Sequence, residues 1–274
     1  MRVVLAAAVA AVLLASGCGS DGDESASSST TTTAAPTTTD APTTTTTAPP
    51  PPRLLVFSRT TGYRHDAIAA ATQAITELAA SAGIGVDASE DPGVFSDANL
   101  ARYRAVVFLL TTGDVLDPGQ EAAVERFVRA GGGYAGVHSA TDTEYDWAFY
   151  GELVGARFKA HPALAKGTVI VEDATHASTA GLPARWTRTD EWYDFRSNPR
   201  PGVHVLLRVD PGSYSGSTMG ADHPIAWCHA VDRGRSWYSA MGHPAEAYAE
   251  PAFRAHLLGG LRYAAGDPAA SSCG

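Results

Sequence analysis

The stretch AVVFLLTTGDVLDPGQEAAVERFVRAGGGYAGVH, residues 105–138, decides the fold of this chain. Its first six residues form an unbroken apolar run, which is typical of a strand buried on both faces of a sheet. Asp117 and Pro118 open a helix as N-cap and first-turn residue, and the three glycines at 131–133 end it. A second strand follows over 134–137. This order predicts two parallel strands joined by a helix that packs on their sheet.

The same alternation continues toward the N-terminus, whereas the pattern changes after about residue 165. Strands are expected at 54–57 and 85–88, with a helix over 67–82 between them. The C-terminal half shows strands with little helix between them before a final helix over 251–264. These later strands are expected at 168–171, 204–209, 225–229 and 236–240. We therefore expect one α/β domain over 53–266, with a parallel sheet, helices on both faces and extra strands in the C-terminal half.

The charge balance argues against a nucleic-acid partner. The 274 residues include 20 basic and 29 acidic side chains, a net charge of −9. No run of Lys or Arg offsets this negative charge, so we expect no polyphosphate partner such as a nucleic acid.

The N-terminus is typical of an exported, membrane-anchored protein. Arg2 precedes an apolar run that is too short to span a bilayer, and small residues lead to Cys18. This arrangement resembles a bacterial lipoprotein signal, with residues 1–17 as signal peptide and Cys18 as the lipidated residue; the alternative is an ordinary cleaved signal. Residues 18–52, rich in Thr, Ser and Pro, are expected to be a disordered linker. The chain is thus expected outside the cytoplasm, anchored to the cell membrane.

The two remaining cysteines, Cys228 and Cys273, leave two possibilities. An oxidising exterior permits a disulfide between them. Because Cys273 lies in a tail over 267–274 that we expect to be flexible, a buried free Cys228 is the favoured interpretation.

Two histidine-bearing segments directly follow predicted parallel strands. His65 comes after the strand at 54–57, and His138 after the strand at 134–137. Because ligands bind beyond the carboxyl ends of such strands, these histidines are candidate catalytic residues, together with Asp142. Asp142 has an alternative role, since Ser139-x-x-Asp142 has the spacing of a helix-capping box.

The segment Gly136-Val137-His138-Ser139-Ala140 has the form of a nucleophile elbow with histidine in the nucleophile's place. Covalent acyl chemistry is therefore disfavoured, and His138 is left as a general base or a metal ligand. His138 and His161 are the candidate ligands of a divalent metal, although no helical ligand pair of standard spacing supports such a site.

Further polar and aromatic residues are candidates for sugar binding. Glu191, a candidate catalytic carboxylate, is followed by two aromatic residues, and aromatic faces beside carboxylates suit the apolar faces and hydroxyl edges of sugar rings. A strand with packed aromatics is the alternative for this segment. The candidate substrate-binding residues are Tyr63, Arg64, Trp192, Tyr193, His223 and His243. His176, His204, His229 and His256 are expected to be structural.

Six motifs in sequence order connect the chain to a known family. They are Gly62-Tyr63-Arg64-His65, Gly132-Gly133-Tyr134-x-Gly136-x-His138-x-Ala140-Thr141-Asp142, Gly155-Ala156-x-Phe158-x-x-His161-Pro162, Asp190-Glu191-Trp192-Tyr193, His223-Pro224-Ile225-Ala226-Trp227 and Gly242-His243. Together they resemble the ThuA-like, or trehalose-utilisation, domain over about 54–265. The resemblance implies a flavodoxin-like sheet of the class I glutamine-amidotransferase type, in which His138 replaces the amidotransferase cysteine.

The resemblance also implies a role in carbohydrate utilisation, on trehalose-like or oxidised disaccharides or glycosides. Two hypotheses follow from the residues and the resemblance together. In the first, the protein is an enzyme that uses histidine and carboxylate chemistry, with or without a divalent metal. In the second, it is a non-catalytic glycan-binding lipoprotein at the cell surface.

Overall fold

The computed structural model describes residues 51–270 and 273. The predicted signal peptide, the lipidation residue Cys18 and all but the last two residues of the predicted linker lie outside the described residues. Within the described part, none of the helices combines the length and the apolar character that crossing a bilayer requires.

The central part of the sheet is parallel, as predicted. Its five strands have the spatial order β2-β1-β3-β4-β11. This is the strand order of a flavodoxin-like, doubly wound sheet, with β11 in the fifth place. The strands are β1 (Arg53–Phe57), β2 (Gly85–Ser89), β3 (Ala105–Leu109), β4 (Gly133–Val137) and β11 (Gly234–Ser239).

Four further strands extend this sheet by antiparallel pairing, in the order β11-β10-β9-β6-β7; β6, β9 and β10 were predicted among the extra strands of the C-terminal half, and β7 was not. A separate pair, β5 (Phe158–Ala160) and β8 (Asp194–Phe195), lies outside the main sheet. The four added strands are β6 (Ala165–Val171), β7 (Arg185–Asp190), β9 (His204–Asp210) and β10 (Pro224–Val231).

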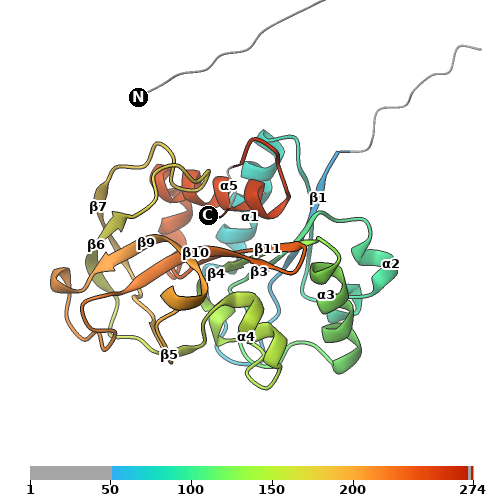
Figure 1. The fold of residues 1–274 in the computed structure, drawn as a ribbon, viewed down its shortest axis with the longest axis horizontal. Coiled ribbons are helices and arrows are strands. Elements are labelled where there is room, and N and C mark those ends of the chain that lie inside the picture. The colour runs from blue at the N-terminus through green and yellow to red at the C-terminus, as the bar shows by residue number, and fades with distance from the viewer. Residues whose placement is uncertain (1–50, 271–272, 274) are drawn as a thin grey trace, which may run out of the picture. The chain divides into compact units, whose positions relative to one another are not determined.

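Helices cover both faces of the sheet (Figure 1). On one face lie α1 (Ile68–Ser81) and α5 (Pro251–Ala264), and on the other α3 (Pro118–Arg129) and α4 (Ala148–Val154). A short helix, α2 (Asp97–Leu100), packs beside α3. Five 3₁₀ helices occur in the described chain, at Pro92–Val94, His138–Asp142, Arg200–Gly202, Pro211–Ser213 and Ala245–Ala249.

The strand β3 and the helix α3, which lie in the stretch that decided the fold, form for the expected reasons. All five residues of β3 are buried. The side chain of Asp117 accepts hydrogen bonds from the backbone N–H groups of Gly119 and Gln120, and the Gln120 side chain accepts one from the N–H of Asp117. This capping box starts α3 where the sequence indicates.

The interpretation of Cys228 as a free thiol is wrong, because Cys228 is disulfide-bonded to Cys273. Cys228 lies fully buried on β10, and the bond joins the C-terminal tail to the middle of the sheet. The two cysteines are 45 residues apart, so no local sequence pattern predicts that they meet.

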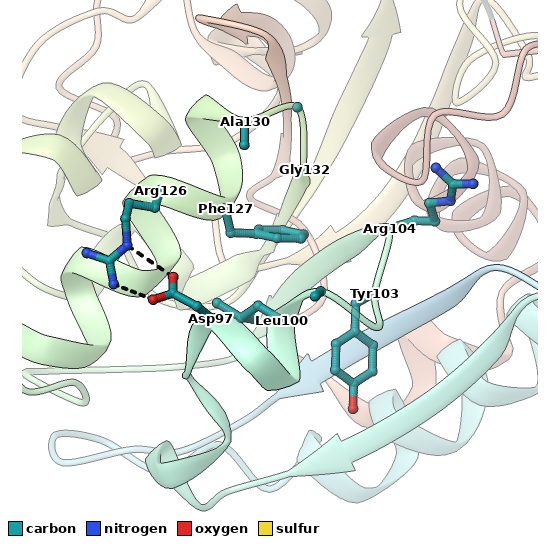
Figure 2. Close-up of a pocket in the computed structure, with 10 residues that line it drawn as sticks. Asp97, Leu100, Tyr103, Arg104, Arg126, Phe127, Ala130 and Gly132 are labelled. Atoms are coloured by element: carbon teal, nitrogen blue, oxygen red, sulfur yellow. Dashed lines mark hydrogen bonds and ion pairs between the residues drawn. The ribbon is translucent and has the colours of Figure 1, made fainter.

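The amino edge of the parallel strands holds a pocket of about 460 Å³ (Figure 2). Arg104 and Gly132, which immediately precede β3 and β4, line it, and the Arg126 guanidinium forms two hydrogen bonds to Asp97 across it. The described residues around this pocket include no histidine. The titratable groups of interest lie at the opposite edge.

Candidate functional site

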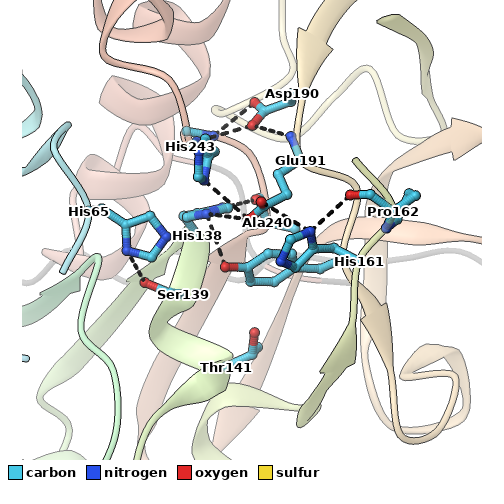
Figure 3. A network of polar contacts seen from close by, with 12 residues as sticks. His65, His138, Ser139, Thr141, His161, Pro162, Asp190, Glu191, Ala240 and His243 are labelled. Carbon is cyan, nitrogen blue, oxygen red and sulfur yellow. Dashed lines mark hydrogen bonds and ion pairs between the residues drawn. The ribbon is translucent and has the colours of Figure 1, made fainter. Parts of the chain in front are cut away.

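The carboxyl ends of four strands bring the candidate residues together. His65, His138 and His243 follow β1, β4 and β11, which are parallel and therefore end at one edge. Glu191 follows β7. Four successive antiparallel pairings lie between β11 and β7, so β7 runs in the same direction as β11 and ends at the same edge of the sheet. Figure 3 shows the three histidines gathered around the carboxylate of Glu191.

His138 is held in one orientation by contacts at both ring nitrogens. It begins the 3₁₀ helix after β4 with φ +53°, a strained backbone conformation for a residue with a side chain. Its Nδ1 lies 2.7 Å from the carbonyl oxygen of Ala240. Because a carbonyl only accepts, Nδ1 carries the proton, and in the neutral ring Nε2 is an acceptor. The hydroxyl of Tyr193 lies 3.0 Å from Nε2 and donates to it.

Glu191 is the carboxylate at the centre of the cluster. Its Oε2 lies 3.5 Å from Nε2 of His138 and 3.1 Å from Nδ1 of His243. Burial by itself would raise the pKa of Glu191, but the interactions with the imidazoles of these two histidines outweigh burial and lower it well below its usual range. In turn, the contact with Glu191 raises the pKa of His243. The arrangement keeps Glu191 ionised although its side chain is largely buried.

His65 is the least tightly held histidine of the cluster. It is 4% exposed, its Nδ1 lies 3.5 Å from Oγ of Ser139, and its ring packs edge-on against His138 and His243. Burial and the proximity of the other histidines lower the pKa of His65 to about 3. His65 is therefore neutral at neutral pH and has a lone pair to offer as base or ligand.

Three members of the cluster, His65, Glu191 and His243, line a cavity of about 470 Å³, whereas His138 is fully buried and does not line it. His161, on the loop after β5, closes one side, with Nδ1 3.0 Å from Oε1 of Glu191. Burial raises the pKa of Asp142, and the hydroxyl of Tyr145 donates to its Oδ1 over 2.6 Å. The lining residues are Tyr63, His65, Asp142, Phe158, His161, Glu191, Tyr193 and His243.

The capping-box alternative for Asp142 is not what the structure shows. Asp142 ends the 3₁₀ helix that starts at His138, and no side chain caps that helix. Its carboxylate instead lies in the cavity wall.

Three predicted substrate-binding residues do not reach the cavity. Arg64 forms a bidentate ion pair with Glu90 on the surface. Trp192 is buried, and its indole N–H donates to the carbonyl of Ala165. His223 is buried behind the cavity wall.

His223 still supports the wall indirectly. Its Nε2 lies 2.8 Å from the carbonyl oxygen of Tyr193, and the Tyr214 hydroxyl lies 2.7 Å from its Nδ1. The histidines expected to be structural also lie outside the cavity lining: His176, His204, His229 and His256.

Sequence reasoning missed the buried pair Arg188 and Asp190. Asp190 is fully buried beside Glu191, and its carboxylate accepts hydrogen bonds from the backbone N–H groups of Gly242 and His243. It thereby fixes the loop that carries His243. Gly242 has φ +116°, and a Cβ there would lie 2.6 Å from the Tyr248 hydroxyl, so only glycine fits this loop. The only available signal was the position of Asp190 within the motif around Glu191.

Comparison with known proteins agrees with this fold. The model of the ThuA family, described as trehalose utilisation, matches residues 53–264. The chain belongs to the ThuA family. A search of curated proteins finds no match.

Solved structures show the same fold at low sequence identity. A putative ThuA-like protein from Bacteroides uniformis is 22% identical, with a TM-score of 0.67 over 80% of this chain and 93% of its own. A second, from Parabacteroides merdae, is 18% identical, with a TM-score of 0.67 over 81% and 92%. A β-galactosidase from Bacillus circulans is 15% identical, with a TM-score of 0.51 over 78% of this chain and 31% of its own. At these identities the likeness concerns the fold alone.

Proposed function

We propose that this ThuA-family protein is a lipid-anchored, extracytoplasmic enzyme that acts on a trehalose-like or oxidised disaccharide or glycoside. The observation that carries the proposal is the convergence of His65, His138, His243 and Glu191 from four strands in one cluster, of which His65, His243 and Glu191 line the cavity. Groups of this kind, imidazoles held at fixed distances from an ionised carboxylate, are suited to moving protons on a bound substrate.

The walls of the cavity support a sugar as the substrate. Tyr63, Phe158 and Tyr193 present aromatic rings, and the carboxylates of Asp142 and Glu191 offer hydrogen-bond acceptors. Aromatic faces match the C–H faces of a pyranose, and carboxylates match its hydroxyl edge. The trehalose-utilisation description of the family is consistent with this substrate class.

The Cys228–Cys273 disulfide supports the placement outside the cytoplasm, because such bonds persist in oxidising compartments. The predicted lipoprotein-type signal over residues 1–17, followed by Cys18, agrees with that placement.

Turnover by the purified full chain, measured on trehalose and on 3-keto disaccharides, tests the proposal. His138→Asn is the key variant, because asparagine tolerates the positive φ of this position better than alanine does. We expect kcat to fall by about 10²- to 10⁴-fold while sugar affinity changes little. His204→Ala, a histidine outside the cavity, is the matched control and should keep full activity. In cells, activity should sediment with membranes, and Cys18→Ala should release it.

The same experiment separates the glycan-binding alternative. If sugars bind to the wild type without turnover, and His138→Asn only weakens that binding, the protein is a binding lipoprotein. Neither binding nor turnover on any disaccharide or glycoside would contradict a carbohydrate role altogether.

A further inference from the structure

We propose that His65, His138, His243 and Glu191 together bind one divalent transition-metal ion of the Zn²⁺ class. The inference names a cofactor for the cavity and rests on the proposed function for what the ion would do there. It also revises the ligand pair expected from the sequence, because His161 is replaced by three other side chains.

The distances within the cluster suit such an ion. One ligand atom from each of the four residues lies within 4.8 Å of all the others. Two of the separations, Oε2 of Glu191 to Nε2 of His138 and to Nδ1 of His243, are 3.5 and 3.1 Å. In a tetrahedral zinc site with bonds of about 2.0–2.1 Å, neighbouring ligand atoms lie about 3.4 Å apart. The Glu191 corner of the site is therefore already close to the required geometry.

Contacts behind the ligands orient them as metal ligands are usually oriented. His138 donates from Nδ1 to the carbonyl of Ala240, which leaves Nε2 toward the cluster. His161 contacts Oε1 of Glu191, which leaves Oε2 toward the cluster. The backbone N–H of His243 is fixed by Asp190. Hydrogen bonds to the atom of a ligand side chain that faces away from the metal set the tautomer and the orientation of that side chain.

The histidine rings lack a better explanation for their arrangement. The ring centroid of His65 lies 4.8 Å from that of His138 and 5.3 Å from that of His243. The centroids of His138 and His243 are also 5.3 Å apart. These three imidazoles pack edge to face, and His65 has only a long contact with Ser139. Bringing several imidazole nitrogens together in a buried place is costly unless a cation or donors satisfy them. One metal ion would take a lone pair from each ring, with Nε2 of His138 exchanging the hydroxyl of Tyr193 for the ion.

The donor set points to the kind of ion. Three imidazoles and one carboxylate suit zinc and related first-row ions, whereas calcium and magnesium prefer oxygen ligands. The cavity opens beside the cluster, so a sugar oxygen could approach as an additional ligand and be polarised.

Metal binding by the full chain, stripped with a chelator and titrated with Zn²⁺ and with Co²⁺, tests the inference. We expect one ion per chain by calorimetry, with a visible Co²⁺ spectrum typical of four- or five-coordination. His65→Ala and Glu191→Gln should each weaken binding at least about 100-fold. His204→Ala should bind as the wild type does, and His161→Ala should still bind one ion. Thermal unfolding of each variant verifies that it is folded.

The outcomes separate the metal from the function. Absence of one-to-one binding by the folded wild type, or unchanged binding in folded His65→Ala and Glu191→Gln, would overturn the metal site. If the stripped protein turned over sugar but bound no metal ion, the proposed enzyme activity would stand and the metal site would be contradicted. Tight binding that needs all four residues, in a protein that turns over no sugar, would retain the metal site and remove the proposed enzyme.

Discussion

At the scale of single residues, the buried carboxylate of Asp190 links the site to the core. One oxygen accepts from the N–H of Gly242 and pairs with the Arg188 guanidinium, at 2.9 and 3.0 Å. The other accepts from the N–H groups of Glu191 and His243. Two side chains of the cluster thus depend on one carboxylate, whose charge is balanced by a buried arginine.

Asp190→Asn should lower the free energy of unfolding by about 3 kcal/mol or more, because Arg188 then loses its close buried carboxylate and keeps Glu250, at 3.5 Å, as its charged partner. Adding Arg188→Met should recover much of that loss. Denaturant unfolding of both single variants and the double variant measures the coupling. Simple addition of the two single losses would contradict a buried pair.

Candidate residues could be located from the sequence where their position after a strand determines that they lie at the carboxyl edge of the sheet. His138 directly follows β4 and His65 lies on the loop after β1, and the carboxyl edge of the sheet brings them together. Arg64 and Trp192 sit next to residues that line the cavity, but their own side chains leave the backbone in other directions. Adjacency in sequence does not fix side-chain direction in a loop, so these two could not be sorted without the structure.

At the scale of elements, β4 and α5 approach each other unusually closely. A Cβ on Gly133, the first residue of β4, would lie 1.9 Å from the carbonyl oxygen of Ala264 at the end of α5. The end of the helix therefore rests on the backbone of the strand that leads to His138.

Gly133→Ala should destabilise the protein by about 2–3 kcal/mol, because either the helix or the strand must move to admit the methyl group. Gly202→Ala is the matched control: nothing lies within 4 Å of a Cβ there, and its effect should stay within about 0.5 kcal/mol. Urea unfolding measures both. Equal losses in the two variants would show that the close approach does not matter.

The elements that sequence patterns predicted are those with continuous apolar runs or clear caps, such as β3 and α3. The strand β7 was not predicted. It reads Arg-Trp-Thr-Arg-Thr-Asp, and its buried positions are Arg188 and Asp190, which are buried because they pair with each other. Hydrophobic periodicity cannot reveal a strand whose buried face is ionic.

At the scale of the whole molecule, two buried histidines make folding sensitive to acid. His256 donates from Nδ1 to the carbonyl of Ser178, and Nδ1 of His176 accepts from the backbone N–H of Ser178. Burial lowers the pKa of His256 to about 3 and that of His176 to about 4. Among the charged groups near them, Arg188 and His204 lower these pKa values further, whereas Asp173 raises that of His176.

Stability should therefore fall as the pH drops below 6.5. The unfolded chain binds protons at these histidines near pH 6.5, while the native protein does not until about pH 3–4, so acid favours unfolding within that window. From pH 7 to pH 5 each histidine should cost about 2 kcal/mol. His256→Gln should lose correspondingly less stability over this range than the wild type in urea unfolding. An identical loss in both proteins would show that His256 does not titrate on unfolding.

The bond between Cys228 and Cys273 encloses β11, His243 and all of α5 within one covalent loop. A protease that cut once inside this loop, for example near the exposed residue Glu246, would leave both fragments attached to each other. Nicked protein would migrate as one chain without reductant and as two with it. The histidine on this segment would thus stay tethered to the sheet after a first cleavage.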